Sequence, residues 1–346
     1  MPGITARLSF ALRESTMENS AKEWNPRCRP SLAVATTLAP ITDITAGLHG
    51  SRETWHTAGV STGQGVTVGW VGALWRYPVK SMLGEPLGPV AVSDGGLDGD
   101  RGFGVVDSRT GMVASAKRPH RWRRLLLLRS EMAGPGVIRI HFPDGHSALS
   151  TDDLVDKLLS NFLGEEVELR SHAPVGAELE RAVPDAVLAD GPVADVEVTI
   201  LEIAAASPPR TFFDFAPLHL VTSASLDQVG AGHPAGRVEP ARYRPNVVIE
   251  TAAGVGGFVE NDWVGQRLHL GPEVIVEILL PTPRCAVPTL RHGDLPHDPE
   301  ALRVPMRKNF VRVPLEGFGS EPCVGVYGTV VKGGRLSPGD EVLLAT

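Results

Sequence analysis

Cys285 is the residue whose type and surroundings point most directly to chemistry. It follows the hydrophobic stretch of residues 274–280 and stands beside Arg284. A positive neighbour favours the thiolate, which is the form of cysteine that attacks a substrate or binds a metal. The alternative is a small, buried, apolar side chain, because free cysteine is among the most buried residue types. Cys285 is therefore a candidate nucleophile or metal ligand.

A turn after an early strand presents two groups that bind anions. Lys80 and Ser81 are adjacent in the run of residues 77–81, so an ammonium and a hydroxyl donor stand together. Such donors suit a phosphate or another anionic group. Arg101, at the end of a turn rich in glycine and aspartate, is a candidate anion clamp. The alternative in each case is an ordinary solvated turn.

Two guanidinium groups and an amide directly precede another apolar strand. Arg242 and Arg244 can each bind an oxyanion through two parallel hydrogen bonds, and Asn246 can both donate and accept toward a heterocycle. A surface loop with ordinary ion pairs is the alternative. Earlier in the chain, Ser223 and Ser225 open a short predicted helix, where N–H groups and hydroxyls can hold a phosphate. Simple N-capping explains these serines equally well.

Two other clusters of polar residues have more ordinary explanations. Residues 117–129 contain six Lys and Arg side chains and no acid, but the net charge of −7 argues against nucleic-acid binding. We interpret this stripe as an exposed strand edge or as the basic rim of an anionic ligand site. His292, Asp294, His297 and Asp298 match no common zinc spacing, so a flexible loop is expected there.

Composition excludes several classes of protein. The chain has 346 residues, of which 42% are hydrophobic, as in a globular protein of about two domains. Its three cysteines include no CxxC pair, so no disulfide framework, zinc ribbon or iron–sulfur cluster is expected. No apolar run approaches the roughly 20 residues of a membrane span. No export signal or GxGxxG loop is visible, and we expect a cytoplasmic protein without a Rossmann fold.

The hydrophobic pattern divides the chain into three parts. Residues 1–66 show no sustained periodicity and are expected to be disordered, unless the translation start is assigned too far upstream. Short apolar runs between Gly, Pro and Asp follow, which predicts mainly antiparallel β structure with a few helices. The loop-rich residues 167–203 mark a junction. The predicted domains are residues 67–190 and residues 191–346, and a second β-barrel is the simplest interpretation of the latter.

A helix and a pair of strands are predicted in more detail. Ser150 is expected to cap a helix, with Asp153 three residues later as in a capping box, and Gly164 is expected to end it. Strands at residues 327–331 and 341–344 are expected to pair with each other. Further strands are expected at residues 218–221, 247–249, 267–270 and 274–280.

Each of these motifs is weak alone, but their order along the chain resembles that of the MOSC family. The resemblance covers about residues 68–346. Over this range the chain is similar to the mitochondrial amidoxime-reducing component and its bacterial relatives. In that arrangement an N-terminal MOSC β-barrel domain precedes the MOSC domain proper. The motifs are Tyr77-Pro78-Val79-Lys80-Ser81, Asp100-Arg101, residues 218–226, Arg244-Pro245-Asn246, Asp262-Trp263, Arg284-Cys285, residues 325–328 and Gly339-Asp340.

The resemblance implies a site for the molybdenum cofactor, a phosphorylated pyranopterin whose dithiolene holds the metal. The family's molybdenum-ligating cysteine falls on Cys285, with Arg284 as a neighbouring cofactor contact. Asp262 is a candidate proton-relay or cofactor-contact residue. A soft thiolate for the metal and cationic or hydroxyl groups for a polyanion agree with this implication. The further matching cofactor contacts are Lys80, Ser81, Arg101, Ser223, Ser225, Arg244 and Asn246.

The function implied by the resemblance is an oxidoreductase that reduces N-hydroxylated small molecules by two electrons. The chain ends without the ferredoxin domain that some bacterial relatives append, so electrons are expected from a separate donor of ferredoxin or flavoprotein type. Two alternatives stay open: a carrier of the molybdenum cofactor without redox turnover, and a sulfur carrier with a persulfide on Cys285. Many relatives have a Val-Asp-Pro turn after the cysteine, whereas residues 288–294 intervene here before His297-Asp298-Pro299, so substrate specificity does not transfer.

Overall fold

The computed structural model describes residues 65–315 and 317–345, which belong to one compact unit. The expected disordered extension, residues 1–66, therefore lies almost wholly outside the described residues. Its last two residues are an exception, because Gly65 and Val66 are the first residues of strand β1 (Gly65–Arg76). The described part of the chain is mainly β structure with a few helices, as the sequence predicted.

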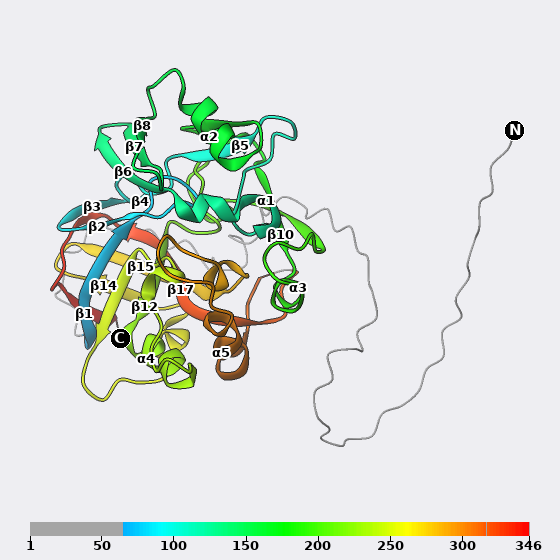
Figure 1. The fold of residues 1–346 in the computed structure, drawn as a ribbon. Helices are drawn as coiled ribbons and strands as arrows, with labels where there is room; N and C mark the ends of the chain where they lie inside the picture. Colours follow the sequence, from blue (N-terminus) through cyan, green and yellow to red (C-terminus); the bar gives the residue numbers. More distant parts are fainter. Residues whose placement is uncertain (1–64, 316, 346) are drawn as a thin grey trace, which may run out of the picture. The chain divides into compact units, whose positions relative to one another are not determined.

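Seven strands close into a barrel (Figure 1). Their order around it is β12, β13, β1, β19, β14, β15 and β17, and β17 pairs back with β12. Neighbours are antiparallel except β12 and β13, which are parallel and are joined through helix α4 (Ser223–Gly232). Closure gives every strand two neighbours, so none of the seven has an open edge. Besides β1, their bounds are β12 (Leu218–Thr222), β13 (Val247–Thr251), β14 (Arg267–Leu270), β15 (Val274–Pro283), β17 (Ser320–Lys332) and β19 (Glu341–Ala345).

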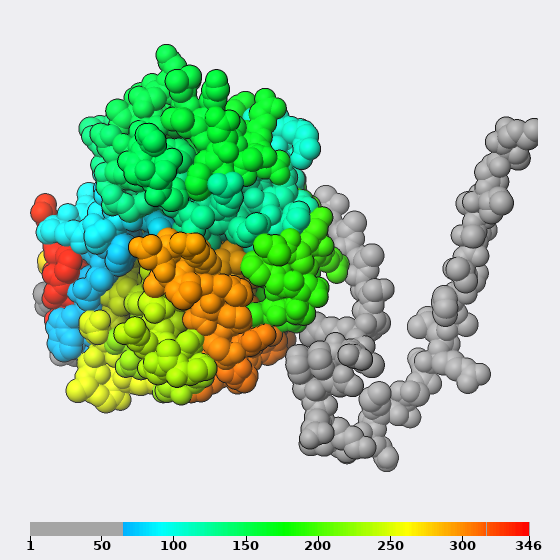
Figure 2. Space-filling view, viewed as in Figure 1, coloured from blue at the N-terminus to red at the C-terminus, as the bar shows by residue number. Residues whose placement is uncertain are grey.

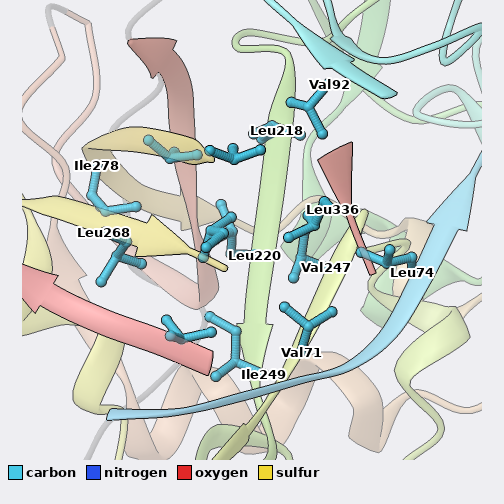
Figure 3. Close-up of a cluster of buried hydrophobic side chains, with 14 of the residues drawn as sticks. Val71, Leu74, Val92, Leu218, Leu220, Val247, Ile249, Leu268, Ile278 and Leu336 are labelled. Atoms are coloured by element: carbon cyan, nitrogen blue, oxygen red, sulfur yellow. The ribbon is translucent and has the colours of Figure 1, made fainter. Parts of the chain in front are cut away.

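Apolar side chains from all around the barrel meet in its interior (Figure 3). Val71 and Leu74 of β1, Leu220 of β12, Ile249 of β13 and Leu268 of β14 are each at most 1% exposed. Alternate residues of a strand point to opposite faces, so one set fills this core while the next set faces outward. The outward-facing side chains are therefore the ones that can line a site on the outer face of the barrel.

The last two barrel strands, β17 and β19, do not pair with each other, which corrects the expectation from the sequence. Strands β15 and β14 lie between them in the barrel. The glycine-rich turn after β17 leads instead into β18 (Gly334–Leu336), which pairs with β3 (Val90–Ser93). Turn signals show where the chain reverses, but they do not show which neighbour a strand finds in a closed barrel.

Two small sheets of the predicted first domain surround a second apolar core, which includes Val105, Ile138 and Leu159. One sheet pairs β5 (Gly104–Asp107) with β9 (Val167–Arg170), and another has the order β6, β7, β8. Strand β1 also lies within residues 67–190, yet it is part of the barrel formed by strands of residues 191–346. The bounds of the second sheet are β6 (Arg129–Gly134), β7 (Val137–His141) and β8 (Ser147–Leu149).

Helix α2 (Val155–Leu163) covers this second core but begins without the predicted capping box. Its N-cap is Leu154, with no side-chain hydrogen bond to the helix. Ser150 Oγ instead accepts a hydrogen bond from the N–H of Ile138 at 3.2 Å, which ties it to strand β7. The predicted end is confirmed, because Gly164 adopts the left-handed conformation with φ 80°.

Short helices and strands complete the fold, and helices α4 and α5 (Glu300–Lys308) adjoin on the face drawn in Figure 2. Strands β10 (Glu178–Ala182) and β11 (Val198–Glu202) form a hairpin-like pair around α3 (Pro184–Asp190). No helix within residues 65–315 or 317–345 is long and apolar enough to cross a membrane. The other elements are β2 (Glu85–Leu87), β4 (Gly96–Leu97), β16 (Phe310–Arg312), α1 (Pro119–Trp122) and the 3-10 helices η1 (Arg123–Leu127), η2 (Pro240–Arg242), η3 (Val259–Trp263) and η4 (Val287–Thr289).

Candidate functional site

A pocket lies against the outer face of the barrel, where β12 and β17 are neighbours. His219 and Tyr327 line it, and they alternate with Leu218, Leu220 and Val326, which fill the barrel core. The pocket contains about 650 Å³ of empty space, part of it open solvent. The other lining residues are Lys80, Ser81, Arg101, Ser115, Lys117, Phe212, Phe213, Asp214, Ala216, Tyr243, Arg244, Asn246, Arg284, Cys285 and Val287.

Seven of the predicted site residues line this pocket, although they come from separate parts of the chain. The turn after β1 supplies Lys80 and Ser81, and the loop after β4 supplies Arg101. The segments that precede β13 and end β15 supply the others. These seven residues are Lys80, Ser81, Arg101, Arg244, Asn246, Arg284 and Cys285.

Three of these pocket residues have a backbone conformation that side chains other than glycine rarely adopt. The φ angles are 65° at Ser81, 46° at Arg101 and 57° at Arg244. Each left-handed residue costs free energy, on the order of 1 kcal/mol, that the surrounding fold must offset. Such residues concentrate at ligand sites, because there the side-chain direction matters more than the local strain.

Two of the arginines stack on one aromatic ring. The guanidinium carbons of Arg101 and Arg244 lie 4.4 and 4.3 Å from the ring centre of Tyr77. Burial, followed by the nearby charge of Arg101, lowers the pKa of Arg244 to about 10, so it remains a cation at neutral pH. Tyr77 is itself buried and therefore fixes where both cations lie.

Asn246 lines the pocket, but protein partners use most of its amide. Its Oδ1 accepts from the N–H of His219 at 3.2 Å, and its Nδ2 donates to the carbonyl of Trp75 and to Oδ2 of Asp100. Asp100 also binds Arg101 Nη1 at 2.5 Å. Asn246 therefore joins β12 and β1 and supports Arg101 from behind, in addition to facing the pocket.

Cys285 is a free thiol, 8% exposed, at the end of β15. The neighbouring Arg284 is held from two sides: its N–H donates to the carbonyl of Pro322, and its Nη2 donates to that of Tyr243. Arg284 Nη1 also lies 3.4 Å from Nε2 of His219. Burial and the Arg284 charge lower the pKa of His219 to about 3, so this imidazole is neutral.

A carboxylate bridges two lysines on the pocket wall. Asp214 Oδ1 lies 2.5 Å from Lys80 Nζ and 2.9 Å from Lys117 Nζ. Burial lowers the pKa of Lys80 to about 8, and Asp214 works against that change. Although burial opposes it, the charges of Lys117 and Lys80 hold the pKa of Asp214 well below its usual range. Asp214 is therefore an anion throughout the physiological pH range.

Three predicted site residues lie outside the pocket. Ser223 Oγ accepts from the N–H of Thr251 and contacts its hydroxyl, both at 3.0 Å. Ser225 is fully buried, and its N–H donates to the side chain of Thr222, which caps α4. The N-capping interpretation thus accounts for this helix start. Asp262 is an exposed residue of η3 whose carbonyl accepts from Gln266. These three residues match the sequence motifs, but they do not line the pocket.

Arg242 differs from Arg244 because it lies in the interior instead of the pocket. Its side chain is 2% exposed, and its Nη1 donates to the carbonyl of Pro296 at 3.0 Å. Its Nε binds Glu239 at 2.8 Å and lies 3.6 Å from Asp298, which also contacts His233. Arg242 therefore holds the loop that follows Cys285, and the expected oxyanion role is not available to it.

The basic stripe at residues 117–129 has two different environments. Lys117 lines the pocket, which agrees with a basic rim. The side chains of Arg118 and Arg121 are paired with acids elsewhere: Arg118 with Glu180, and Arg121 with Asp107. Most of the stripe therefore stabilises the fold around the second core.

The histidine and aspartate residues near residue 295 do not converge. His292 is buried, with Nδ1 against the carbonyl of Leu290, while Asp294 and His297 are exposed. Asp298 faces His233. Across residues 65–315 and 317–345, no group of three or more His, Cys, Asp or Glu side chains is placed to hold a metal ion.

Sequence reasoning missed Asp214 and His219, which both line the pocket. Asp214 stands in the aromatic run of residues 212–215, and an acid among aromatic residues just before a buried strand was the available signal. His219 was hidden inside the apolar strand β12, where its alternation with Leu218 and Leu220 indicates the opposite face. Their partners are far along the chain, so the sequence alone could not join them.

The pocket on the outer face of the closed β-barrel combines cationic side chains with a buried thiol, which suits an anionic ligand. Residues 208–343 match the MOSC domain, and residues 68–153 match the MOSC N-terminal beta barrel domain. Together these ranges cover more than half of the chain, which belongs to the MOSC domain family. MOSC domains are associated with proteins that bind the molybdenum cofactor.

Individual proteins resemble the chain less closely than the two family models do. No curated protein matches the chain. Among solved structures, the YUAD protein from Bacillus subtilis is similar over 81% of this chain and 97% of that chain, with 12% identity and a TM-score of 0.38.

The pocket residues fit a phosphorylated ligand that carries a metal. Within the described residues, the side chain of Arg244 donates no hydrogen bond, and its Nη1 is buried without a partner, as is Nε of Arg284. Buried guanidinium donors without partners are what a bound anion satisfies. Cys285 adds a soft thiol, which suits a sulfur-bound metal. The cations that line the pocket are Lys80, Arg101, Lys117, Arg244 and Arg284.

Proposed function

We propose that this protein binds the molybdenum cofactor in the barrel pocket and is an oxidoreductase that reduces N-hydroxylated small molecules. The observation that carries the proposal is the position of Cys285 in the same pocket as five cationic side chains. A thiol alone would suit a nucleophile, and cations alone would suit any anion. Their combination suits a polyanion that also presents a metal to a sulfur ligand.

Each group in the pocket has a role in holding this ligand. Arg244, whose donors are free, and Arg101, stacked on the same tyrosine, bind the phosphate. Lys80 and Ser81 contribute an ammonium and a hydroxyl from the turn after β1. Cys285 would ligate the metal as a thiolate, and its 8% exposure largely shields it from water.

The bound cofactor supplies the two-electron redox chemistry, while the protein supplies orientation and electrostatics. Reduction of an N–OH group takes two electrons and two protons, and it yields N–H and water. The electrons come from a separate protein of ferredoxin or flavoprotein type. His219, held neutral by burial and by Arg284, keeps the wall beside Cys285 free of additional positive charge.

Paired cysteine variants test the proposal. Wild-type protein made in a host that synthesises the cofactor should reduce N-hydroxybenzamide to benzamide with a reduced viologen as the electron source. Cys285→Ser should abolish this turnover, since it removes the metal ligand. Cys323→Ser is the matched control, because Cys323 is also buried and free but does not line the pocket.

Unchanged turnover in Cys285→Ser would contradict the proposed role of the thiol. Metal binding without turnover of any N-hydroxylated compound would instead favour a carrier of the cofactor. A persulfide on Cys285 after incubation with a desulfurase, in protein that binds no metal, would favour a sulfur carrier.

A further inference from the structure

The two lysines bridged by Asp214 lie at different depths. The side chains of Lys80, Lys117 and Asp214 are 5%, 16% and 36% exposed. Lys80 is held from behind as well, because its Nζ donates to the carbonyl of Phe212 at 2.9 Å. Lys80 therefore belongs to the floor of the pocket, and Asp214 with Lys117 belongs to its mouth.

The two carboxylate oxygens of Asp214 differ in their contacts. Oδ1 contacts both lysines, whereas no hydrogen bond to Oδ2 is found within the described ranges. A carboxylate has about four acceptor sites, so much of its capacity is unused. Since the lysines keep the carboxyl ionised and the side chain is 36% exposed, Oδ2 is a charged acceptor at the mouth.

Lys117 complements this oxygen. Its ammonium has three donors, and Asp214 is its partner within the described residues. The pocket mouth thus presents an acceptor and a donor side by side, because Lys117 Nζ lies 2.9 Å from Oδ1 of the same carboxylate. A small molecule with an N–H donor next to an acceptor oxygen matches this pair in polarity.

We propose that Asp214 and Lys117 form a substrate-recognition pair that selects N-hydroxylated compounds bearing an N–H beside the N–O group. The substrate N–H donates to Asp214 Oδ2, and a substrate oxygen accepts from Lys117. A compound in which the N–H is replaced by an N-alkyl group leaves the Asp214 oxygen desolvated without a partner. Leaving a buried polar group unpaired is the strongest source of discrimination between similar ligands.

This inference rests on the proposed function for its choice of ligands, but its test does not need turnover. The probes are N-hydroxybenzamide and N-methyl-N-hydroxybenzamide, in which a methyl group replaces the N–H hydrogen. Their dissociation constants are measured by calorimetry at pH 7 on protein purified with its cofactor. Wild type should bind the N–H compound at least about tenfold more tightly, as expected for a hydrogen bond to a charged acceptor.

Asp214→Asn should remove most of that preference. Lys117→Gln should weaken the binding of both compounds and leave the ratio of their dissociation constants unchanged. Asp227→Asn, an exposed carboxylate on α4, is the matched control and should change neither constant. Molybdenum content is measured on each variant, so loss of the cofactor is recognised separately.

Equal affinity of wild type for the two compounds, or an unchanged ratio in Asp214→Asn, would overturn the recognition pair. Failure of the proposed function looks different: protein without molybdenum, or with molybdenum but without reduction of either compound. A preference for the N–H compound that depends on Asp214 would stand even then.

Discussion

Nη1 of Arg284 lies 3.4 Å from Nε2 of His219. Nε2 also lies 3.3 Å from the carbonyl of Val324, and Nδ1 lies 3.4 Å from the carbonyl of Arg244, so a neutral imidazole can donate to one of these two carbonyls. This neutral form agrees with the low pKa of His219. The contact joins β12 to the residue before Cys285, and so fixes the wall of the pocket on both sides of the thiol.

The neutral state of His219 predicts a loss of stability in acid. The pKa is about 3 in the folded protein against 6.5 for an ordinary histidine, so the unfolded chain binds the proton more readily as pH falls below 6.5. Stability is therefore unaffected above pH 6.5 and declines between pH 6.5 and 3. His219→Gln should remove this part of the decline, on the order of 3 kcal/mol by pH 4.

The measurement is the unfolding free energy in urea at pH 7 and pH 4 for wild type and His219→Gln. The difference between the two proteins should shrink, or change sign, at the lower pH. A difference that is the same at both pH values would show that His219 is protonated in the folded state.

The stacking of two arginines on Tyr77 predicts that its ring, and not its hydroxyl, matters for holding the cofactor. Tyr77→Phe should retain pterin close to the wild-type level through extended dialysis. Tyr77→Leu should lose affinity for it by about tenfold, because two cation–π contacts disappear. Equal retention by the phenylalanine and leucine variants, at matched thermal stability, would rule out this role of the ring.

The buried position of Arg242 predicts a large effect on stability. Arg242→Met leaves Glu239, Asp298 and three backbone carbonyls with fewer partners, and should lower the free energy of unfolding by about 3 kcal/mol or more. Arg237→Met, at an exposed arginine nearby, should change it by less than about 0.5 kcal/mol. Urea unfolding of both variants decides the matter, and similar values would show that Arg242 is not a structural anchor.

The sequence singled out seven residues that the structure brings to one pocket, although their roles stay predictions. Motifs at strand ends, such as Lys80 and Cys285, lie together there because such ends carry their side chains to one edge of a barrel whatever its pairing. The serines of α4 were not separable from a helix cap, since both uses need the same residue types at the same helix start. The Asp214 bridge was beyond reach, because its two lysines are 134 and 97 positions away in the chain.

The sequence also predicted the strands of the fold better than it predicted their pairing. The alternating apolar pattern predicted most barrel strands, including Arg267–Leu270. It could not show that β1 completes a barrel with strands from the other end of the chain, because pairing depends on closure and not on local pattern. The same reason explains why β17 and β19 were wrongly expected to pair.

Asp262 and Ser223 lie outside the pocket, which predicts that neither is needed for cofactor binding. Asp262→Asn and Ser223→Ala should each retain the wild-type molybdenum content. Ser223→Ala should still lower stability by about 1 kcal/mol, since the N–H of Thr251 loses its partner. Metal loss in either variant at unchanged stability would place these residues back among the cofactor contacts.

The central claim is that the thiol of Cys285 and the surrounding cations hold the molybdenum cofactor. Its most direct test is elemental analysis of molybdenum per chain, on wild type and Cys285→Ser purified from a host that makes the cofactor. The expected result is nearly one molybdenum per wild-type chain and a marked loss in the variant, with Cys323→Ser like wild type. A folded wild-type protein without molybdenum, or a variant that keeps its full content, would contradict the account.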